Sequence, residues 1–344
     1  MFFATIDCGT TNSRVYLLDE NCNIINKGEK KVGVRDTAIN GTNSILREGL
    51  KEVFLETVKE GGVKVTEVEF AITSGMITSE IGLIEIPHLW APAGIDELAQ
   101  NVKIVRDDEV FPVNVPLIFV RGIKNFFPAE TTYRDIRMID FMRGEETQVA
   151  GLLSLYPQLD LPVNLVVLSS HTKYIHINEA GKITGSLTTL SGQVFEAIKK
   201  ETFIGKSIRS NTANEQEDFF NEEIVETAFD SVKNAGFLRT LLMPRFMEVL
   251  LKTNWYERKL FIETAIVAED LRVLEEFKNL NFSRDCTFVL VGHKIRCDIM
   301  KYLLNKHYQI NSIKCISQKE EIDELSIQGA IAIARKTGHL KGGK

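Results

Sequence analysis

The sequence predicts an α/β protein built from two domains. Its length of 344 residues exceeds what a single domain usually contains. Short apolar strands alternate along the chain with segments of helical periodicity, which is the pattern of α/β folds. A strand, a hydroxyl-rich turn and a second strand occur at residues 2–19 and again at residues 165–177, and this repeat indicates a structural duplication. We expect one domain over residues 1–145 and the other over residues 146–344.

The first strand covers the apolar residues 2–6 and ends at Asp7. The following residues, Cys8-Gly9-Thr10-Thr11-Asn12-Ser13, are too polar and too rich in glycine and asparagine to extend it. Such a turn can direct backbone N–H groups and hydroxyls at one point, which suits a phosphate. Asp7 would then act on the phosphates through Mg²⁺ held by water. An ordinary β-hairpin with a polar turn explains the same residues, so both interpretations stay open at this stage.

Helix and strand continue to alternate through the first domain. Residues 42–60 carry apolar side chains at helical spacing, and Gly61–Gly62 ends that helix. Residues 68–73 predict a strand that leads into a loop of small residues at 74–79. Open α/β sheets bind ligands beyond the carboxyl ends of their strands, so this loop is a candidate binding segment. Residues 84–94, which contain prolines and aromatic side chains, predict an irregular segment that lines a groove.

A charged block opens the next helix. Residues 142–148 read Met-Arg-Gly-Glu-Glu-Thr-Gln, and apolar residues follow at 149–153. Acidic residues in the first turn complement the helix dipole, which gives Glu145 and Glu146 a purely structural explanation. Alternatively, Arg143 and the two glutamates form part of a site.

The second half repeats the opening arrangement. Residues 165–168 predict a buried strand, followed by the turn Ser169-Ser170-His171-Thr172-Lys173 and a further strand at 174–177. A helical region then extends from residue 195 to about residue 278, and strands are predicted at 287–291 and 312–316. The small residues at 325–334 predict a helix that packs closely against its neighbours.

Composition and charge exclude several classes of protein. A net charge of −6 and a pI of about 5.7 argue against nucleic acid as a partner. The sequence has no run of 18 apolar residues, so we expect no transmembrane helix and no membrane partner. The first residues lack the basic start of a signal peptide. The five cysteines are odd in number and scattered, as expected of reduced thiols in a cytoplasmic protein.

Taken together, these motifs resemble the actin/hexokinase/Hsp70 ATPase superfamily. More narrowly, the chain is similar to the 2-dehydro-3-deoxygalactonokinase family of bacterial sugar-acid kinases. The resemblance covers most of the chain, and the block at residues 142–148 is its most specific part. The other matching positions are Asp7–Arg14, Gly75-Met76, Ser79, Pro92-Ala93-Gly94, His171, Lys173, Val291-Gly292 and Gln328-Gly329. The resemblance implies an α/β fold of two ribonuclease-H-like (actin-like ATPase) domains with an ATP cleft between them.

The same resemblance implies an activity, in which MgATP phosphorylates the terminal (C6) hydroxyl of 2-dehydro-3-deoxy-D-galactonate during galactonate catabolism. Asp7 would hold Mg²⁺ through water. Contacts to ATP would come from Gly9, Thr10, Thr11, Ser13, Ser169, Ser170, His171, Lys173 and Gly292. The sugar acid would be bound by Arg143, Gly75, Met76, Ser79 and Trp90, although Arg143 could equally pair with a neighbouring glutamate.

A sugar hydroxyl needs a carboxylate to accept its proton. We favour Glu145 for this role, narrowly ahead of Asp140, with Glu146 as the third candidate. The chain departs from the family pattern at Ser169, where glycine is usual, and at Gln193 and Ile266, where glutamate is usual. These departures leave two alternatives open: a kinase of a related sugar or keto-deoxy acid, or a weakly catalytic regulator that binds ATP or a sugar. The oligomeric state also stays open, and a homodimer is one option.

Overall fold

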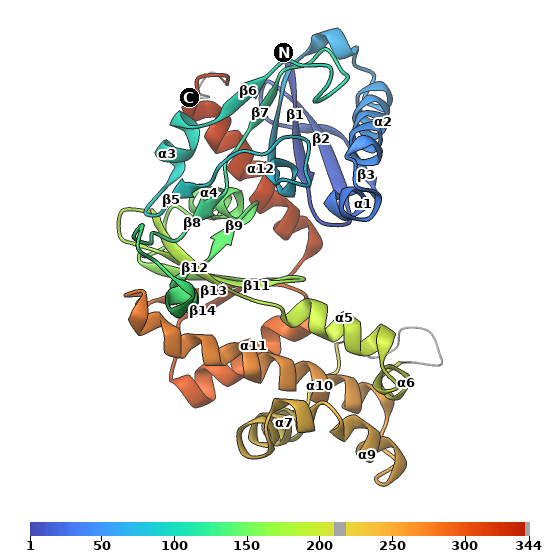
Figure 1. Ribbon diagram of the computed structural model, residues 1–344, viewed down its shortest axis with the longest axis vertical. Helices are drawn as coiled ribbons and strands as arrows, with labels where there is room; N and C mark the ends of the chain where they lie inside the picture. The colour runs from blue at the N-terminus through green and yellow to red at the C-terminus, as the bar shows by residue number, and fades with distance from the viewer. Residues whose placement is uncertain (210–217, 341–344) are drawn as a thin grey trace. The chain divides into compact units, whose positions relative to one another are not determined.

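The computed structural model describes residues 1–209 and 218–340 (Figure 1). The chain forms two compact units. The first contains Met1–Leu159, Asn178–Ser186 and the segment from Asp323 onward, and the second contains Asp160–Ile177 and Leu187–Ile322. In the described residues, no helix has both the length and the apolar character needed to cross a bilayer. The five cysteines are free thiols, as the sequence predicts.

The first unit is built on a six-stranded sheet in the order β3-β2-β1-β4-β7-β6. Its central strand β1 (Phe2–Cys8) pairs antiparallel with β2 (Ser13–Asp19) and parallel with β4 (Val68–Gly75). The remaining strands are β3 (Ile24–Lys30), β7 (Leu117–Phe119) and β6 (Lys103–Val105). The apolar face of α2 (Ser44–Glu60) packs on β2 and β3 and buries Leu46, Leu50 and Phe54 at helical spacing.

Smaller elements of the first unit connect these strands and carry the candidate site. The helices are α1 (Val34–Asn40), α3 (Ile95–Gln100) and α4 (Glu145–Leu155), with 3-10 turns at Val65–Glu67, Met76–Thr78 and Tyr133–Met138. A three-stranded sheet contains β5 (Leu89–Trp90), β8 (Ile123–Lys124) and β9 (Phe141–Met142), in that order. Because β9 ends one residue before Arg143, this small sheet fixes where the charged block begins.

The second sheet has the order β12-β11-β10-β13-β14. Its central strand β10 (Val163–Leu168) is buried throughout, pairs antiparallel with β11 (Thr172–Ile177) and pairs parallel with β13 (Thr287–Gly292). The outer strands are β12 (Ile183–Thr189) and β14 (Ile313–Ile316). In both sheets, therefore, the first strand lies between an antiparallel second strand and a parallel later strand. This shared order confirms the predicted duplication and the ribonuclease-H-like α/β class.

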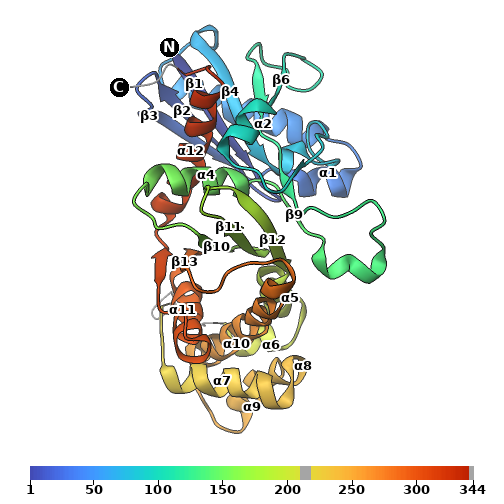
Figure 2. The ribbon, with the colours of Figure 1, turned by 90° about the vertical axis from the view of Figure 1, so that its left-hand side faces the viewer.

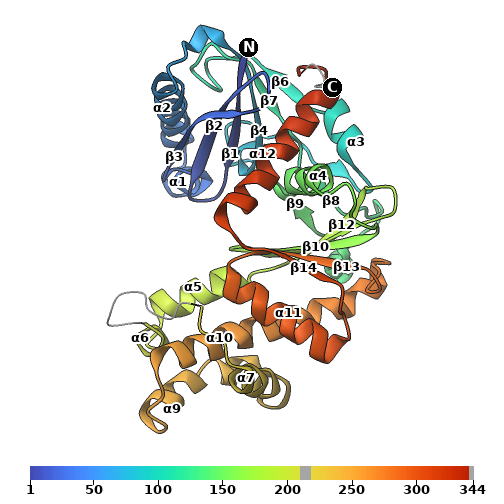
Figure 3. The same cartoon turned by 180° about the vertical axis from the view of Figure 1, so that it is seen from behind.

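The predicted helical region of the second unit consists of several helices around α10 (Trp255–Asp270). They are α5 (Ser191–Glu201), α6 (Ile204–Ser207), α7 (Glu222–Ala235), α8 (Phe237–Thr240), α9 (Met243–Val249) and the 3-10 segment Leu271–Asn279. Eleven of the residues of α10 are buried, because α5, α7, α8, α9 and α11 (Lys294–Tyr308) all contact it (Figure 3). A helix enclosed in this way carries apolar side chains on most of its surface.

The end of the chain returns to the first unit. Helix α12 (Lys319–Lys336) lies beside α4 (Figure 2), and the two backbones meet at Gly151 and Gly329. A Cβ atom at residue 329 would lie 1.8 Å from the carbonyl oxygen of Thr147, so only glycine allows this approach. The predicted division at 145/146 differs from the observed units in this respect, because α4 and most of α12 belong to the first unit.

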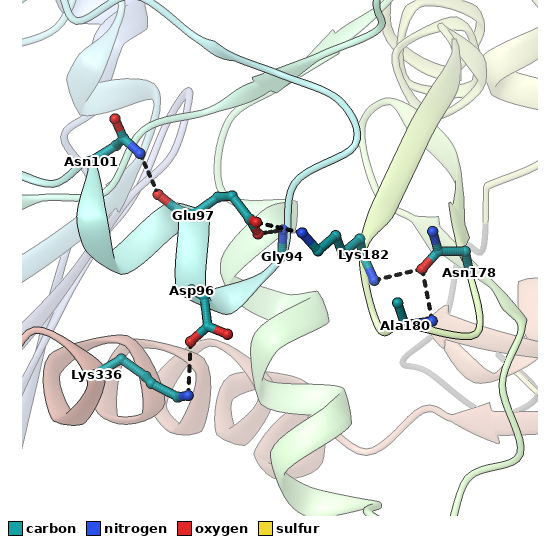
Figure 4. Close-up of polar contacts among 8 residues, drawn as sticks. All are labelled: Gly94, Asp96, Glu97, Asn101, Asn178, Ala180, Lys182 and Lys336. Carbon is teal, nitrogen blue, oxygen red and sulfur yellow. Dashed lines mark hydrogen bonds and ion pairs between the residues drawn. The ribbon is translucent and has the colours of Figure 1, made fainter.

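Side chains of helix α3 bond to two other segments of the first unit, the turn between β11 and β12 and the helix α12 (Figure 4). The carboxylate of Glu97 accepts hydrogen bonds from the Lys182 ammonium at 2.5 Å and from the backbone N–H of Gly94 at 2.9 Å. These bonds lower the pKa of Glu97, with Lys182 as the larger cause. Asp96 pairs with Lys336 of α12 at 2.8 Å. The turn between β11 and β12 is thereby attached to the first unit, which explains why residues 178–186 belong there.

We expect Gly329→Ala to destabilise the protein. In a helix, alanine is favoured over glycine by up to about 1 kcal/mol, but here its Cβ atom would meet backbone at 1.8 Å. Helix α12 must then move, and the free energy of unfolding should fall by about 1–3 kcal/mol in urea denaturation. Gly62→Ala is the control, since no atom lies within 4 Å of its Cβ position and only the positive φ is strained. Equal stability of the two variants would contradict the close crossing.

Candidate active site

The first turn connects β1 to β2, and its backbone is hydrogen-bonded to the start of α1. The backbone N–H of Gly9 donates to the Asn12 carbonyl at 3.0 Å and closes the turn. The carbonyl oxygen of Thr10 accepts from the N–H of Arg35 at 2.9 Å, at the start of α1. Thr11 and Asn12 are exposed, while Gly9 and Thr10 are half-buried. The turn therefore presents its surface to solvent in a fixed conformation.

Ser13 occupies a different position from the one expected of a phosphate contact. Its side chain is fully buried, and its hydroxyl donates to the Val32 carbonyl at 2.8 Å. Ser13 therefore connects the end of the turn to the segment that follows β3. The available hydroxyls of this turn are those of Thr10 and Thr11.

Asp7 lies at the end of β1, directly opposite Arg14 on β2. The guanidinium Nη1 of Arg14 is 3.7 Å from Asp7 Oδ2 and 3.6 Å from Asp323 Oδ1. Desolvation raises the pKa of Asp7 and the charge of Arg14 opposes that rise. The Asp7 side chain is 36% exposed, so its enclosure is only partial, and the charge of Asp323 adds to the rise in its pKa.

One carboxylate suits a cation that keeps most of its water, as Mg²⁺ does. In the part of the chain that the structure describes, no three His, Cys, Asp or Glu side chains gather in a way that could hold a metal directly. The contact of Asp7 with Mg²⁺ through water stays a prediction.

Two glycines allow the end of β4 and the start of α4 to lie against the end of β1. Gly75, the last residue of β4, is aligned with Cys8, and a Cβ atom there would lie 2.6 Å from the Cys8 carbonyl oxygen. Gly144, just before α4, would place a Cβ atom 3.3 Å from the Cα of Gly75. Both have positive φ, at +93° and +111°. The start of α4 is thus fixed beside the strand end that carries Asp7.

The three candidate carboxylates differ in their surroundings. Glu146 is 1% exposed, and both of its oxygens accept the Gly144 N–H, at 2.9 and 2.8 Å. Burial and the charge of Glu145 raise the pKa of Glu146 to about 8. Asp140 accepts a hydrogen bond from the Ser186 hydroxyl at 3.1 Å. Glu145 is half-buried at the first position of α4, so it keeps the location expected of a base.

Arg143 is held by the loop that follows β4. Its Nη1 donates to the Thr78 hydroxyl at 2.7 Å, and its Nη2 donates to the Ile86 carbonyl at 3.0 Å. Burial lowers the pKa of Arg143, and the charge of Glu146 opposes this. Nη2 also lies 3.4 Å from the His88 ring nitrogen Nδ1. The loop therefore holds the guanidinium, which has five N–H groups in all, at three points.

The other predicted sugar contacts lie around the same loop. Met76 is half-buried, whereas Ser79 is 2% exposed and donates its hydroxyl to the Met76 carbonyl at 2.7 Å. Trp90 is 44% exposed in β5, with the Lys124 ammonium 3.7 Å from its ring centroid. Ser79 therefore stabilises the loop from within, and Trp90 belongs to the small three-stranded sheet.

The second turn connects β10 to β11 within the second unit. Ser169 and Ser170 are exposed, and the Ser169 hydroxyl donates to the His171 carbonyl at 2.9 Å. Burial and the charge of Lys173 lower the pKa of His171, so its imidazole is neutral at pH 7. Lys173 is 8% exposed and donates to the Thr188 hydroxyl at 2.8 Å.

Gly292 repeats in the second sheet the position that Gly75 has in the first. It is aligned with Leu168, the last residue of β10, and a Cβ atom there would lie 2.8 Å from the Leu168 carbonyl oxygen. Its φ of +153° is also positive. Each sheet therefore brings a later strand against the residue that precedes its turn.

Several residues that shape these sites were not anticipated. Thr78 and the buried Asn125, which bonds to the backbone of Ser186, position Arg143 and Asp140. Ile266 is buried in a cluster with Ile198 and Ile262, so it serves the core. Asp270 lies seven residues after Glu263 on α10, and both are buried. This spacing along one helix face was the only sequence signal that could have identified Asp270.

Glu146 should make stability depend on pH. Its pKa is about 8 when folded and near the ordinary 4.5 when unfolded, so the unfolded chain releases this proton first as pH rises. The free energy of unfolding should therefore fall between about pH 4.5 and 8, by up to about 5 kcal/mol. Urea denaturation of wild type and Glu146→Gln across this range tests the idea. The free energy of unfolding of the glutamine variant should depend less on pH than that of wild type, and an equal dependence would contradict the prediction.

Comparison with known proteins places this geometry in context. A family model described as 2-keto-3-deoxy-galactonokinase matches residues 7–319. A curated relative, a probable 2-dehydro-3-deoxygalactonokinase of Rhizobium meliloti (strain 1021), is 23% identical over 208 residues, which are 60% of this chain. The matched part spans 59% of that relative's length.

Solved structures share the fold. A protein of Sinorhizobium meliloti, provisionally assigned as a 2-dehydro-3-deoxygalactonokinase, has a TM-score of 0.70 and 18% identity, with 97% of this chain and 98% of that chain covered. A reductive activator for a corrinoid, iron-sulfur protein has a TM-score of 0.51 and 13% identity, with 98% of this chain and 61% of that chain covered. These likenesses confirm the predicted two-domain fold.

Proposed function

The chain belongs to the 2-keto-3-deoxy-galactonokinase family, and we propose that it uses ATP to phosphorylate the terminal (C6) hydroxyl of 2-dehydro-3-deoxy-D-galactonate. The observation that carries this proposal is the contact of Cys8, Gly75 and Gly144, which gathers Asp7, the first turn and Glu145 in one region. Phosphoryl transfer needs a positioned nucleotide, a cation and an oriented hydroxyl. These residues can supply each of them.

In this proposal the first turn binds phosphate oxygens through its backbone and the hydroxyls of Thr10 and Thr11. Asp7 would hold Mg²⁺ through water, and the cation would supply positive charge against the phosphates. The charge of Arg14 favours the ionised form of Asp7, which this role requires. The second turn, Ser169–His171, has two exposed serines and binds phosphate oxygens in the same manner.

The sugar acid is proposed to bind beside the loop that follows Gly75. Arg143 faces this loop through Thr78 and Ile86, and its remaining N–H groups can bind a carboxylate. Glu145 accepts the proton of the attacking hydroxyl, because Glu146 is enclosed and Asp140 already holds Ser186. Ser79 and Ser13 contribute through the loops they stabilise.

We expect Glu145→Gln to lower kcat by about 10²-fold or more, since the glutamine cannot accept the proton. The assay follows ADP formation with MgATP and 2-dehydro-3-deoxy-D-galactonate, and the melting temperature should stay within a few degrees of the wild-type value. Asp140→Asn is the matched control, and it should keep stability and turnover near the wild-type values because its amide oxygen can still accept from the Ser186 hydroxyl. Normal turnover in Glu145→Gln together with a large loss in Asp140→Asn would transfer the role to Asp140.

The substrate is tested with the same assay and a panel of keto-deoxy acids and simple sugars. The proposal expects the highest kcat/KM for 2-dehydro-3-deoxy-D-galactonate. A higher value for another keto-deoxy acid would keep the reaction and change the substrate. Binding of ATP without ADP formation across the panel would instead favour the regulator that the departures at Ser169, Gln193 and Ile266 leave open.

A further inference from the structure

A buried carboxylate of the second unit has no part in the reaction described above. Asp270 is the last residue of α10 and is 4% exposed. Its Oδ1 accepts a hydrogen bond from the Thr189 hydroxyl at 2.5 Å. The Ser191 hydroxyl lies 3.4 Å from that of Thr189 and 2.6 Å from that of Thr172, so the three hydroxyls form a chain that begins at this carboxylate. This chain of hydroxyls connects α10 to β11, β12 and the start of α5.

The three hydroxyls around Asp270 border the second turn. Thr172 directly follows His171, and its hydroxyl lies 2.6 Å from that of Ser191. Ser191 opens α5, where the N–H of Gln193 donates to the Ser170 carbonyl at 2.9 Å. The turn is thus held through Thr172 on the strand side and through Ser191 on the helix side.

The backbone at this place leaves little room for adjustment. A Cβ atom at Gly192 would lie 2.2 Å from the Ser169 carbonyl oxygen. That oxygen also accepts a hydrogen bond from Arg296 of α11, at 3.2 Å from Nη1. Movement of the α5 start would therefore be transmitted directly to Ser169 and Ser170.

Stability alone does not account for a carboxylate at this position. Burying a charge is costly, and well-packed apolar side chains are often as stable as a buried polar network or more so. Among the described residues, Asp270 Oδ2 and Arg296 Nη2 have no hydrogen-bond partner, so the network is incompletely satisfied. What such a network does supply is one fixed arrangement of its hydroxyls.

We propose that Asp270 is a positioning residue for the second turn. It fixes the side chains of Thr172, Thr189 and Ser191 and so presets the backbone of Ser169–His171 for nucleotide phosphates. The inference rests on the proposed function, because it assigns those phosphates to this turn. Asp270 itself touches no nucleotide, and its effect reaches the ligand through the hydroxyls.

The test is titration calorimetry with Mg²⁺ and a non-hydrolysable ATP analogue, which needs no knowledge of the sugar substrate. Asp270→Ala removes the acceptor and should raise Kd by about tenfold or more, in line with the loss of a buried hydrogen bond to a charged group. Asp270→Asn keeps an oxygen for Thr189 and should stay within about threefold of wild type. In turnover assays the KM for ATP should rise more than kcat falls.

Controls separate positioning from general destabilisation. Thr264→Ala changes another fully buried polar residue of α10 and should leave the Kd unchanged. Thr189→Val removes the shortest hydrogen bond to Asp270, and its effect should not add to that of Asp270→Ala in the double variant. If Asp270→Ala fails to fold, Thr189→Val carries the test alone, with a several-fold rise in Kd expected.

Two failures can be told apart. Wild-type protein that does not bind the analogue would overturn the proposed function, and the inference would fall with it. Wild-type protein that binds, with Kd unchanged in Asp270→Ala or in a folded Thr189→Val, would overturn only the role of Asp270.

Discussion

The candidate site of the first unit depends on backbone segments that meet without side chains between them. Cys8, Gly75 and Gly144 come from β1, β4 and the residue before α4, and each glycine removes the Cβ atom that would separate them. This contact sets the distance between the strand end with Asp7 and the helix start with Glu145. Larger side chains would move the carboxylates apart even if every functional group were kept.

The second unit has the same close backbone contact at the equivalent position. Gly292 meets Leu168 as Gly75 meets Cys8, at the ends of paired parallel strands. The chemistry beyond these contacts has diverged, because the first unit follows with acidic residues and the second with the exposed serines of its turn. Duplication therefore accounts for the shared backbone arrangement of the two sites, and the different side chains on each account for their different roles.

Local patterns in the sequence predicted most strands of the two large sheets, both turns and the fold class, and the resemblance of its motifs predicted the family. From the sequence we ranked Glu145 above Glu146, but local patterns gave no sign that Glu146 is buried, since two adjacent glutamates look alike until the Gly144 N–H binds one of them. The partners of Arg143 lie 65 and 57 residues away, and no spacing rule points to Thr78 or Ile86. The assignment of α12 to the first unit escaped prediction for the same reason, because its contact at Gly329 joins segments far apart in the chain.

That contact has a consequence for how the protein is made. A ribosome delivers β1 and α4 long before it delivers α12, and the whole second unit is synthesised in the interval. During this time α4 presents Thr147 and Gly151 without the helix that covers them in the finished protein. The first unit to emerge is thus the last to be completed, and a chain released early would leave its α4 surface open to association with other nascent chains.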